Sequence, residues 1–112
     1  MSESLFTKII KGDLSSTKEY ESEKILVIHD INPIAPVHLL IITKTPYKNL
    51  QSVPVKDLPV LTEVFEVAQN LAAKFKIADN YRIVTNNGIK AGQHVFHLHF
   101  HLIGGRELND LL

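Results

Sequence analysis

Three histidines occupy alternate positions near the end of the chain, at His97, His99 and His101, with large apolar residues between them. Strict alternation is typical of a β-strand, so the three imidazoles are expected to share one face, about 7 Å apart. Histidine titrates near neutral pH without perturbation and is also a common metal ligand. The spacing therefore predicts a site that attacks or binds a phosphate group, or one that holds a metal ion.

These residue types allow more than one chemistry. Neutral imidazole can attack phosphorus, while a neighbouring imidazolium can neutralise phosphate charge and protonate a leaving group. Alternating histidines completed by another ligand can instead form an open zinc site. If the histidines only filled a strand face, each would need its own buried partner, which disfavours that interpretation. The residues alone leave the nucleophilic and the zinc interpretations open.

The elements that position the histidines follow from hydrophobic periodicity. We expect a short helix over residues 5–11 and strands over 18–21, 25–29, 38–43, 81–85 and 95–103. A long amphipathic helix is expected to begin at a cap formed by Asp57, with Pro59 in its first turn. Its apolar side is predicted to consist of Leu58, Leu61, Phe65, Ala68, Ala72 and Phe75. The pattern predicts an α+β fold with one long helix on one face of a sheet.

The segment 86–94 joins the last two expected strands and precedes the three histidines. It is rich in residues that accept positive φ, and it is expected to present backbone N–H groups to phosphate oxygens. Because this connection is short, the strands on either side of it are expected to pair antiparallel.

Composition narrows the class of protein. A chain of 112 residues with 45% hydrophobic residues fits a single domain over residues 1–112. Twelve basic residues balance twelve acidic ones without a Lys/Arg block, so neither nucleic acid nor an anionic membrane is an expected partner. The absence of cysteine excludes disulfides, a thiol nucleophile and a thiolate zinc site. Without a signal-like or membrane-spanning apolar segment, a cytoplasmic location is expected.

The run GQHVFHLHFHLIGGR, residues 92–106, resembles the signature of the histidine triad (HIT) nucleotide hydrolases. Its Gly104-Gly105-Arg106 ending is more similar to the Hint branch than to the Fhit branch, and the similarity extends to residues 6–12, 29–38 and 81–88. The resemblance implies a five-stranded antiparallel sheet with one long and one short helix. It also implies a homodimer whose protomers form a continuous sheet.

The resemblance further implies an enzyme and its substrate class. A Hint-type purine nucleoside phosphoramidase would cleave the P–N bond of adenosine 5′-monophosphoramidates through a nucleotidyl-histidine and release AMP, with no cofactor or metal. His99 would be the nucleophile and His101 would contact the phosphate and help the leaving group depart, while His97 and His38 would support the cluster. A nucleotide-binding regulatory module with incidental turnover and a zinc-binding protein are the alternatives.

Nucleotide-binding residues follow from the same resemblance. Asp30 would bind both ribose hydroxyls, which suits a carboxylate that can accept two hydrogen bonds. Ile31, together with Phe6, Ile9 and Ile28, would form the base pocket. Phosphate and ribose contacts are expected from Asn86, Gly92, Gln93 and His94, the last standing where many Hint proteins have a serine. Without the motif, Asp30, Asn86 and Gly92 would be interpreted as turn residues.

Overall fold

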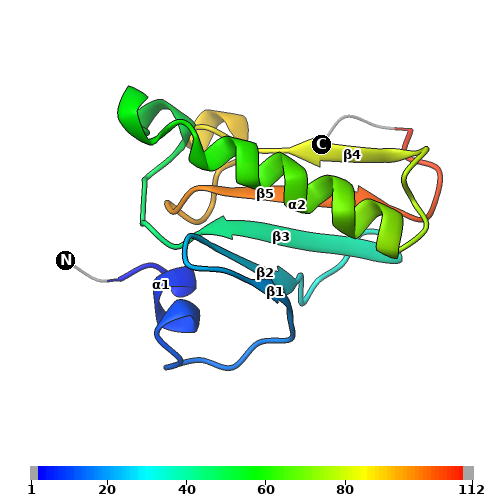
Figure 1. The fold of residues 1–112 in the computed structure, drawn as a ribbon, viewed down its shortest axis with the longest axis horizontal. Coiled ribbons are helices and arrows are strands. Elements are labelled where there is room, and N and C mark those ends of the chain that lie inside the picture. Colours follow the sequence, from blue (N-terminus) through cyan, green and yellow to red (C-terminus); the bar gives the residue numbers. More distant parts are fainter. Residues whose placement is uncertain (1–2, 110–112) are drawn as a thin grey trace.

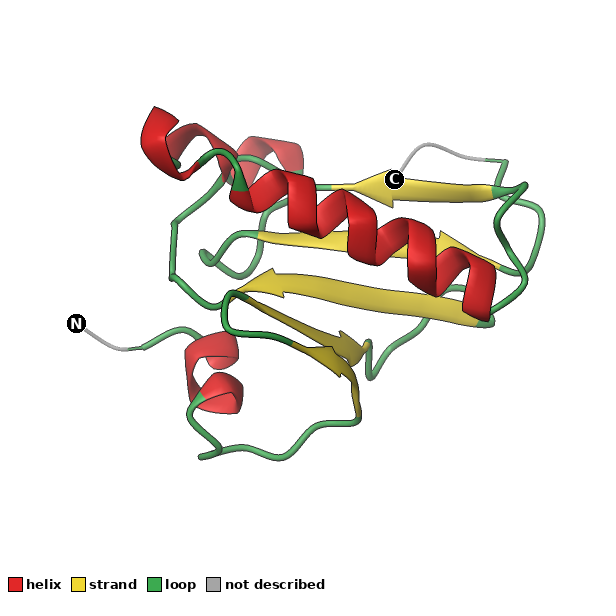
Figure 2. Ribbon diagram, viewed as in Figure 1, coloured by secondary structure: helices red, strands yellow, loops and turns green. Residues whose placement is uncertain are grey.

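The computed structural model describes residues 3–109, which form a five-stranded antiparallel sheet of order β1-β2-β3-β5-β4. The strands are β1 (Lys18–Glu21), β2 (Ile25–His29), β3 (Val37–Thr43), β4 (Tyr81–Val84) and β5 (His99–Gly104). Helices are α1 (Leu5–Ile10) and α2 (Val60–Lys74), with short 3-10 turns η1 (Leu50–Ser52), η2 (Val55–Asp57) and η3 (Ile89–Ala91). Figures 1 and 2 show α2 lying across the sheet. The expected five-stranded antiparallel sheet with a long helix is confirmed.

The two faces of the sheet are covered by different helices, because successive strand residues point to opposite sides. Under α2 lies a core that includes Ile25, Val27, Leu39, Ile41, Phe100 and Leu102. On the opposite face, the intervening residues Leu26, Ile28, Leu40 and Ile42 pack against Phe6 and Ile9 of α1. Burial on both faces explains why β2 and β3 are nearly continuous apolar runs.

The buried face of α2 differs from the one predicted. Phe65 is 47% exposed and Leu58, which precedes the helix, is 39% exposed, whereas Val64 is fully buried. The face that meets the sheet consists of Val60, Val64, Val67, Ala68, Leu71 and Ala72. Both rows have helical spacing and share the two alanines, so periodicity alone fits either of them.

The start of α2 also differs from the prediction. Its N-cap position is Pro59, and no side chain makes a capping hydrogen bond. Asp57 lies in η2, where its carboxylate accepts a hydrogen bond from the Tyr47 hydroxyl at 2.8 Å. The predicted cap is therefore wrong, because a tertiary contact engages the aspartate.

The last strand is shorter than the alternation predicts. It begins at His99, and residues 95–98 follow an irregular path. In this segment the Leu98 N–H donates to the Tyr47 carbonyl at 2.7 Å, a bond outside the sheet ladder. Only His99 and His101 therefore lie on β5, while His97 precedes the strand.

The loop between β4 and β5 takes the positive φ angles expected of its glycines, 101° at Gly88 and 93° at Gly92.

Within residues 3–109, none of the helices has the length and apolar character needed to cross a bilayer.

Candidate active site

Sheet register brings three of the histidines together on the face covered by α1. His101 pairs with Leu40 and His99 with Ile42, so both imidazoles share the face of these buried side chains. His38, two residues before Leu40 on β3, lies diagonally across from His101. The rings of His99 and His101 are 5.2 Å apart between centroids. The predicted sharing of one face thus holds for His99 and His101, and β3 adds His38.

His99 has one ring nitrogen in a hydrogen bond, and its other nitrogen has no partner among the described residues. Its Nδ1 lies 2.7 Å from the carbonyl oxygen of His97, and a carbonyl can only accept, so Nδ1 carries the proton. In the neutral ring, Nε2 then keeps its lone pair. Burial lowers the pKa of His99, which favours this neutral form, and the edge of Phe6 packs at 4.9 Å between ring centroids. The geometry leaves Nε2 with a lone pair that can accept a proton or attack an electrophile.

A chain of hydrogen bonds fixes the opposite tautomer at His101. The backbone N–H of Ile34 donates to Nδ1 of His38 at 3.2 Å, so neutral His38 carries its proton on Nε2. That nitrogen lies 2.9 Å from Nδ1 of His101 and donates to it. Neutral His101 therefore carries its own proton on Nε2, where it can donate to a bound anion.

Protonation of His101 is disfavoured in the free site. Burial, followed by the neighbouring His99 and His38, lowers its pKa to about 4, although the Asp30 carboxylate opposes this shift. Burial also lowers the pKa of His38. The cluster is consequently neutral near pH 7 until an anion enters it.

His97 is fully buried and supports the site from behind. Its Nε2–H donates to the Thr43 carbonyl at 2.6 Å, so its Nδ1 accepts from the Ser4 hydroxyl, also at 2.6 Å. Ser4 caps α1 through the Thr7 N–H at 3.0 Å. Burial lowers the pKa of His97. One side chain thus ties the N-terminal helix to the histidine whose carbonyl orients His99.

Asp30 follows β2 and reaches the same cluster. Its Oδ2 is 3.3 Å from Nε2 of His38, and its Oδ1 accepts the Asn32 N–H at 2.8 Å. The backbone N–H of Asp30 donates to the His38 carbonyl at 3.0 Å. The aspartate therefore makes the turn contact expected of its residue type and also faces the histidines.

A cavity of about 990 Å³ lies over this face. Every predicted site residue except His38 and His97 contributes to its wall: Asp30, Ile31, Asn86, Gly92, Gln93, His94, His99 and His101. Apolar side chains of Phe6, Ile9, Leu14 and Ile28 line it too, and among residues 3–109 no lysine or arginine does. The buried Ser16 hydroxyl in the wall has no hydrogen-bond partner among the described residues. The cavity combines apolar surface with imidazoles and one carboxylate.

The loop residues differ in what they offer to a ligand. The Gln93 side chain is buried; its Oε1 accepts the Gly88 N–H at 2.8 Å and its Nε2 donates to the Lys48 carbonyl at 2.7 Å. Backbone N–H groups of Gly92 and Gln93 donate within the loop, to Ile89 and Gly88. His94 is exposed at the cavity. Gly92 and Gln93 thus shape the loop, and their N–H groups are not the free donors expected from the sequence.

Three ligand atoms at the cluster could hold a metal ion. Atoms of Asp30, His38 and His101 all lie within 4.8 Å of one another. Two imidazoles and a carboxylate suit zinc chemically. His38 and His101 are also hydrogen-bonded to each other, through Nε2 of His38 and Nδ1 of His101 at 2.9 Å.

Contacts that fix the tautomers include residues that the sequence did not identify as functional. Ser4 has a residue type that is common at helix N-caps, but its hydrogen bond to His97 joins residues 93 positions apart in the sequence. The Ile34 contribution is a backbone N–H and has no side-chain signature.

Comparison with known proteins places the chain in a family. Residues 11–108 match the HIT domain. A HIT-like protein of Chlamydia pneumoniae is 48% identical over 107 residues, covering 96% of this chain and 97% of that protein. The structure of a HIT family hydrolase from Clostridium thermocellum is 42% identical with a TM-score of 0.94, covering 100% of this chain and 98% of the other. A histidine triad nucleotide-binding protein from Candida albicans is 32% identical with a TM-score of 0.81, covering 98% and 86%. The chain belongs to the HIT family.

Proposed function

We propose that this protein is a nucleotidyl hydrolase of the Hint type that cleaves the P–N bond of adenosine 5′-monophosphoramidates and related conjugates, releasing AMP. One observation carries the proposal: the His97 carbonyl holds the proton of His99 on Nδ1 at 2.7 Å, which leaves the Nε2 lone pair free in the wall of the cavity. The neighbouring His101 has the opposite tautomer and offers an N–H to the phosphate. The two rings divide the roles of nucleophile and anion donor.

The reaction proceeds in two displacements. Nε2 of His99 forms a bond to the α-phosphorus while the P–N bond breaks, and the amine takes its electron pair. Binding the phosphate anion favours uptake of one proton by the imidazole cluster, and the departing amine carries this proton away. Water then forms the new P–O bond and breaks the P–Nε2 bond, and the cluster receives the proton that water loses.

The cavity suits a nucleotide with one anionic phosphoryl group. Because no lysine or arginine lines it, the imidazoles and the Asn86 and His94 side chains would meet the phosphate and leaving group. Asp30 would accept both ribose hydroxyls. Phe6, Ile9 and Ile28 would enclose the base together with Ile31, which is 89% exposed and supplies the rim. The nucleotide-binding protein of similar structure supports this class of ligand.

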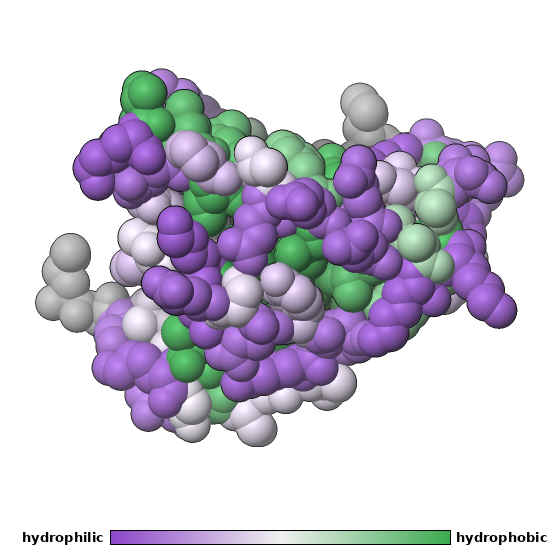
Figure 3. Space-filling model, viewed as in Figure 1, coloured by the Kyte–Doolittle hydropathy of each residue, from purple (hydrophilic) through white to green (hydrophobic). Residues whose placement is uncertain are grey.

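We assign a homodimer to the same proposal. Strand β4 lies at one edge of the sheet, and edge strands can pair with a strand of another chain. Apolar side chains are exposed just before α2 and in its first half. Val55 is 82% exposed, Leu58 39% and Phe65 47%. Figure 3 shows hydrophobic surface over the N-terminal end of α2. Pairing of β4 with its symmetry mate would extend the sheet and cover this surface.

Zinc binding is a second candidate function, favoured by the convergence of Asp30, His38 and His101 within 4.8 Å. Stoichiometric zinc after purification without chelator, lost in a His101→Ala variant, would support it. A nucleotide-binding regulatory module in the cytoplasm is the remaining alternative, and there the partner-dependent effect would survive loss of His99.

Turnover of adenosine 5′-phosphoramidate to AMP, followed by chromatography, tests the proposal. Wild-type protein should release AMP, whereas His99→Ala should bind AMP without releasing product from the substrate. Equal turnover by the two proteins would overturn the proposed role of His99, and AMP binding without any wild-type turnover would favour the regulatory module.

A further inference from the structure

The Gly104-Gly105-Arg106 sequence that ends the triad motif forms a tight turn against two other segments. A Cβ on Gly104 would lie 2.8 Å from Cδ1 of Ile77, and one on Gly105 would lie 3.1 Å from Cβ of Pro36. Gly105 also has a φ of 93°, which disfavours residues with a side chain. Gly104 therefore lets the chain pass close to Ile77 and Gly105 lets it pass close to Pro36, and the turn carries Arg106 with it.

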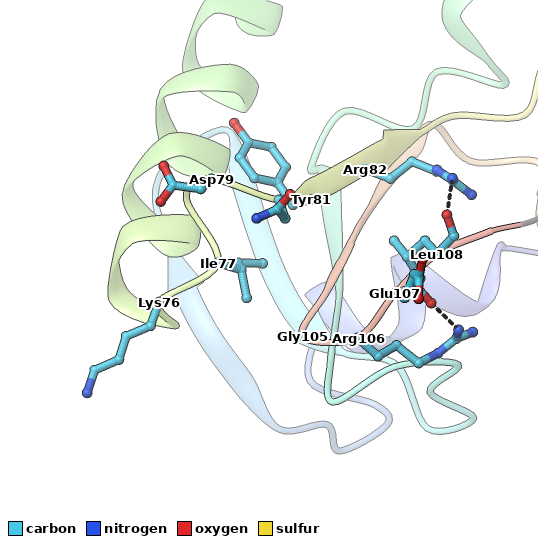
Figure 4. A pocket seen from close by; sticks show the side chains of 10 residues that line it. Lys76, Ile77, Asp79, Tyr81, Arg82, Gly105, Arg106, Glu107 and Leu108 are labelled. Carbon is cyan, nitrogen blue, oxygen red and sulfur yellow. Dashed lines mark hydrogen bonds between the residues drawn. The ribbon is translucent and has the colours of Figure 1, made fainter.

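From this position, the Arg106 side chain makes a hydrogen bond to the loop that precedes β3. Its Nε donates to the carbonyl oxygen of Ile34 at 2.8 Å, and its guanidinium donates to the Glu107 carbonyl at 2.7 Å. Figure 4 shows Arg106 and Glu107 at the edge of a second cavity, of about 760 Å³, beyond the end of β5. The arginine reaches a residue 72 positions away in sequence.

The residue that Arg106 holds donates to His38 and helps to set the histidine tautomers, together with the Asp30 carboxylate at 3.3 Å from Nε2 of His38. Ile34 accepts from Arg106 through its carbonyl and donates through its N–H to Nδ1 of His38 at 3.2 Å. Pro33 and Pro36 lie on either side of Ile34 and Ala35, and neither proline has a backbone N–H to donate. Among the described residues, the hydrogen bonds of residues 33–36 are made by Ile34. Arg106 is therefore a principal restraint on the position of that donor.

We propose that Arg106 is a positioning residue of the active site: by holding Ile34, it keeps the backbone N–H on His38 and so keeps the N–H of His101 directed at the phosphate. This inference rests on the proposed phosphoryl transfer. If Ile34 moves away, His38 can carry its proton on Nδ1 and accept from His101 through Nε2. His101 would then present a lone pair to an anion, which opposes the reaction.

Side-chain chemistry at position 106 allows a sharp test. Arg106→Met removes the donor and retains an extended side chain. Arg106→Gln places an amide nitrogen the same number of bonds from Cα as Nε, so it can restore the hydrogen bond without the charge. The chain has one other arginine, Arg82, which lines the same cavity and donates to the Leu108 carbonyl at 3.1 Å (Figure 4). Arg82→Met is the matched control.

Nitrogen-15 NMR of the imidazole rings reports the tautomers directly and needs no substrate. In the wild type we expect His38 and His101 to carry their protons on Nε2 and His99 on Nδ1. Arg106→Met should add the Nδ1–H form at His38 and His101 and lower kcat about tenfold, the effect of weakening one charge-assisted hydrogen bond, with little change in KM. Arg106→Gln and Arg82→Met should retain the wild-type ring signals and kcat.

Unchanged tautomers and kcat in Arg106→Met would overturn the inference. A loss in Arg106→Gln as large as in Arg106→Met would overturn it as well, because charge and not the hydrogen bond would then be the cause. If the wild type shows no phosphoramidase turnover, the proposed function fails, while the ring signals still decide whether Arg106 sets the tautomers.

Discussion

The Nδ1–H of His99 donates to the carbonyl oxygen of His97 over 2.7 Å, which commits the opposite nitrogen of the ring to the cavity. His97 can provide this acceptor because its own ring is anchored to Thr43 and Ser4 at 2.6 Å each. The irregular path of residues 95–98 is what directs the carbonyl at the ring two positions later. In the proposed reaction, a ring already fixed in this tautomer would need no rearrangement before attack.

Removing a ribose hydroxyl from the substrate should weaken binding with little effect on the chemical step. If Asp30 accepts both hydroxyls, losing one charged hydrogen bond costs roughly 1.5–3 kcal/mol, or about ten- to a hundredfold in affinity. A 2′-deoxy phosphoramidate should therefore show a higher KM and a similar kcat. Steady-state kinetics of the two substrates check this, and changing the substrate leaves the Asp30 contact with His38 undisturbed. Equal KM values would show that Asp30 is only a turn residue.

Replacing Ser4 by alanine should weaken both α1 and the support of His97. Loss of a serine N-cap typically lowers the free energy of unfolding by about 1 kcal/mol. The His97 ring also loses the nearer of its two hydroxyl partners at Nδ1, which leaves the longer contact with the Thr7 hydroxyl at 3.4 Å, so kcat should fall as well. Urea unfolding and kinetics measure the two effects separately. Ser4→Thr, which retains a hydroxyl, is the control, and a Ser4→Ala protein with wild-type stability and kcat would contradict this role.

Stability should fall as the solution becomes acidic. Burial lowers the pKa of His38, His97, His99 and His101 in the folded protein, whereas the unfolded chain binds protons near the ordinary pKa of about 6.5. The contribution of the buried neutral rings is thus complete above about pH 6.5 and is lost as pH falls toward the depressed values, about 4 for His101. Each histidine adds at most about 1.4 kcal/mol per pH unit.

Urea unfolding across this pH range measures the effect. His97→Asn should reduce the slope of stability against pH, because one buried imidazole no longer titrates on unfolding. Parallel stability curves for the variant and the wild type would count against the buried neutral state of His97.

Chelation should leave the phosphoramidase activity intact. The proposed steps use imidazoles alone, and none of them needs a metal at Asp30, His38 and His101. Activity measured before and after EDTA treatment, and again after zinc addition, checks this prediction. Loss with EDTA that zinc restores would require a metal-dependent mechanism.

Periodicity predicted the strands of the sheet and the shared face of His99 and His101, because alternation reports which side chains lie on the same side. It could not predict where β5 begins, since Val95 to Leu98 continue the apolar pattern while their backbone leaves the ladder. The apolar row predicted for α2 was correct in part. Ala68 and Ala72 are buried and Leu61 and Phe75 pack against the core, whereas Leu58 and Phe65 are exposed and the valines meet the sheet.

The hydrogen bonds that fix where the histidines carry their protons could not be predicted from the sequence. Ser4, Ile34 and Arg106 act on histidines through hydrogen bonds that either span most of the chain or use backbone atoms. Side-chain identity and spacing carry no signal for such bonds. The resemblance to the HIT family predicted the roles of the histidines. The structure adds the hydrogen bonds that give His99 and His101 different tautomers.

Trapping the covalent intermediate tests the central claim most directly. Wild-type protein mixed with adenosine 5′-phosphoramidate and quenched rapidly should gain the mass of an adenylyl group, and peptide mapping should place it on His99. His99→Ala should bind AMP and show no adduct. An adduct that persists in His99→Ala, or one that maps to His101 in the wild type, would contradict the assignment of His99 as the nucleophile.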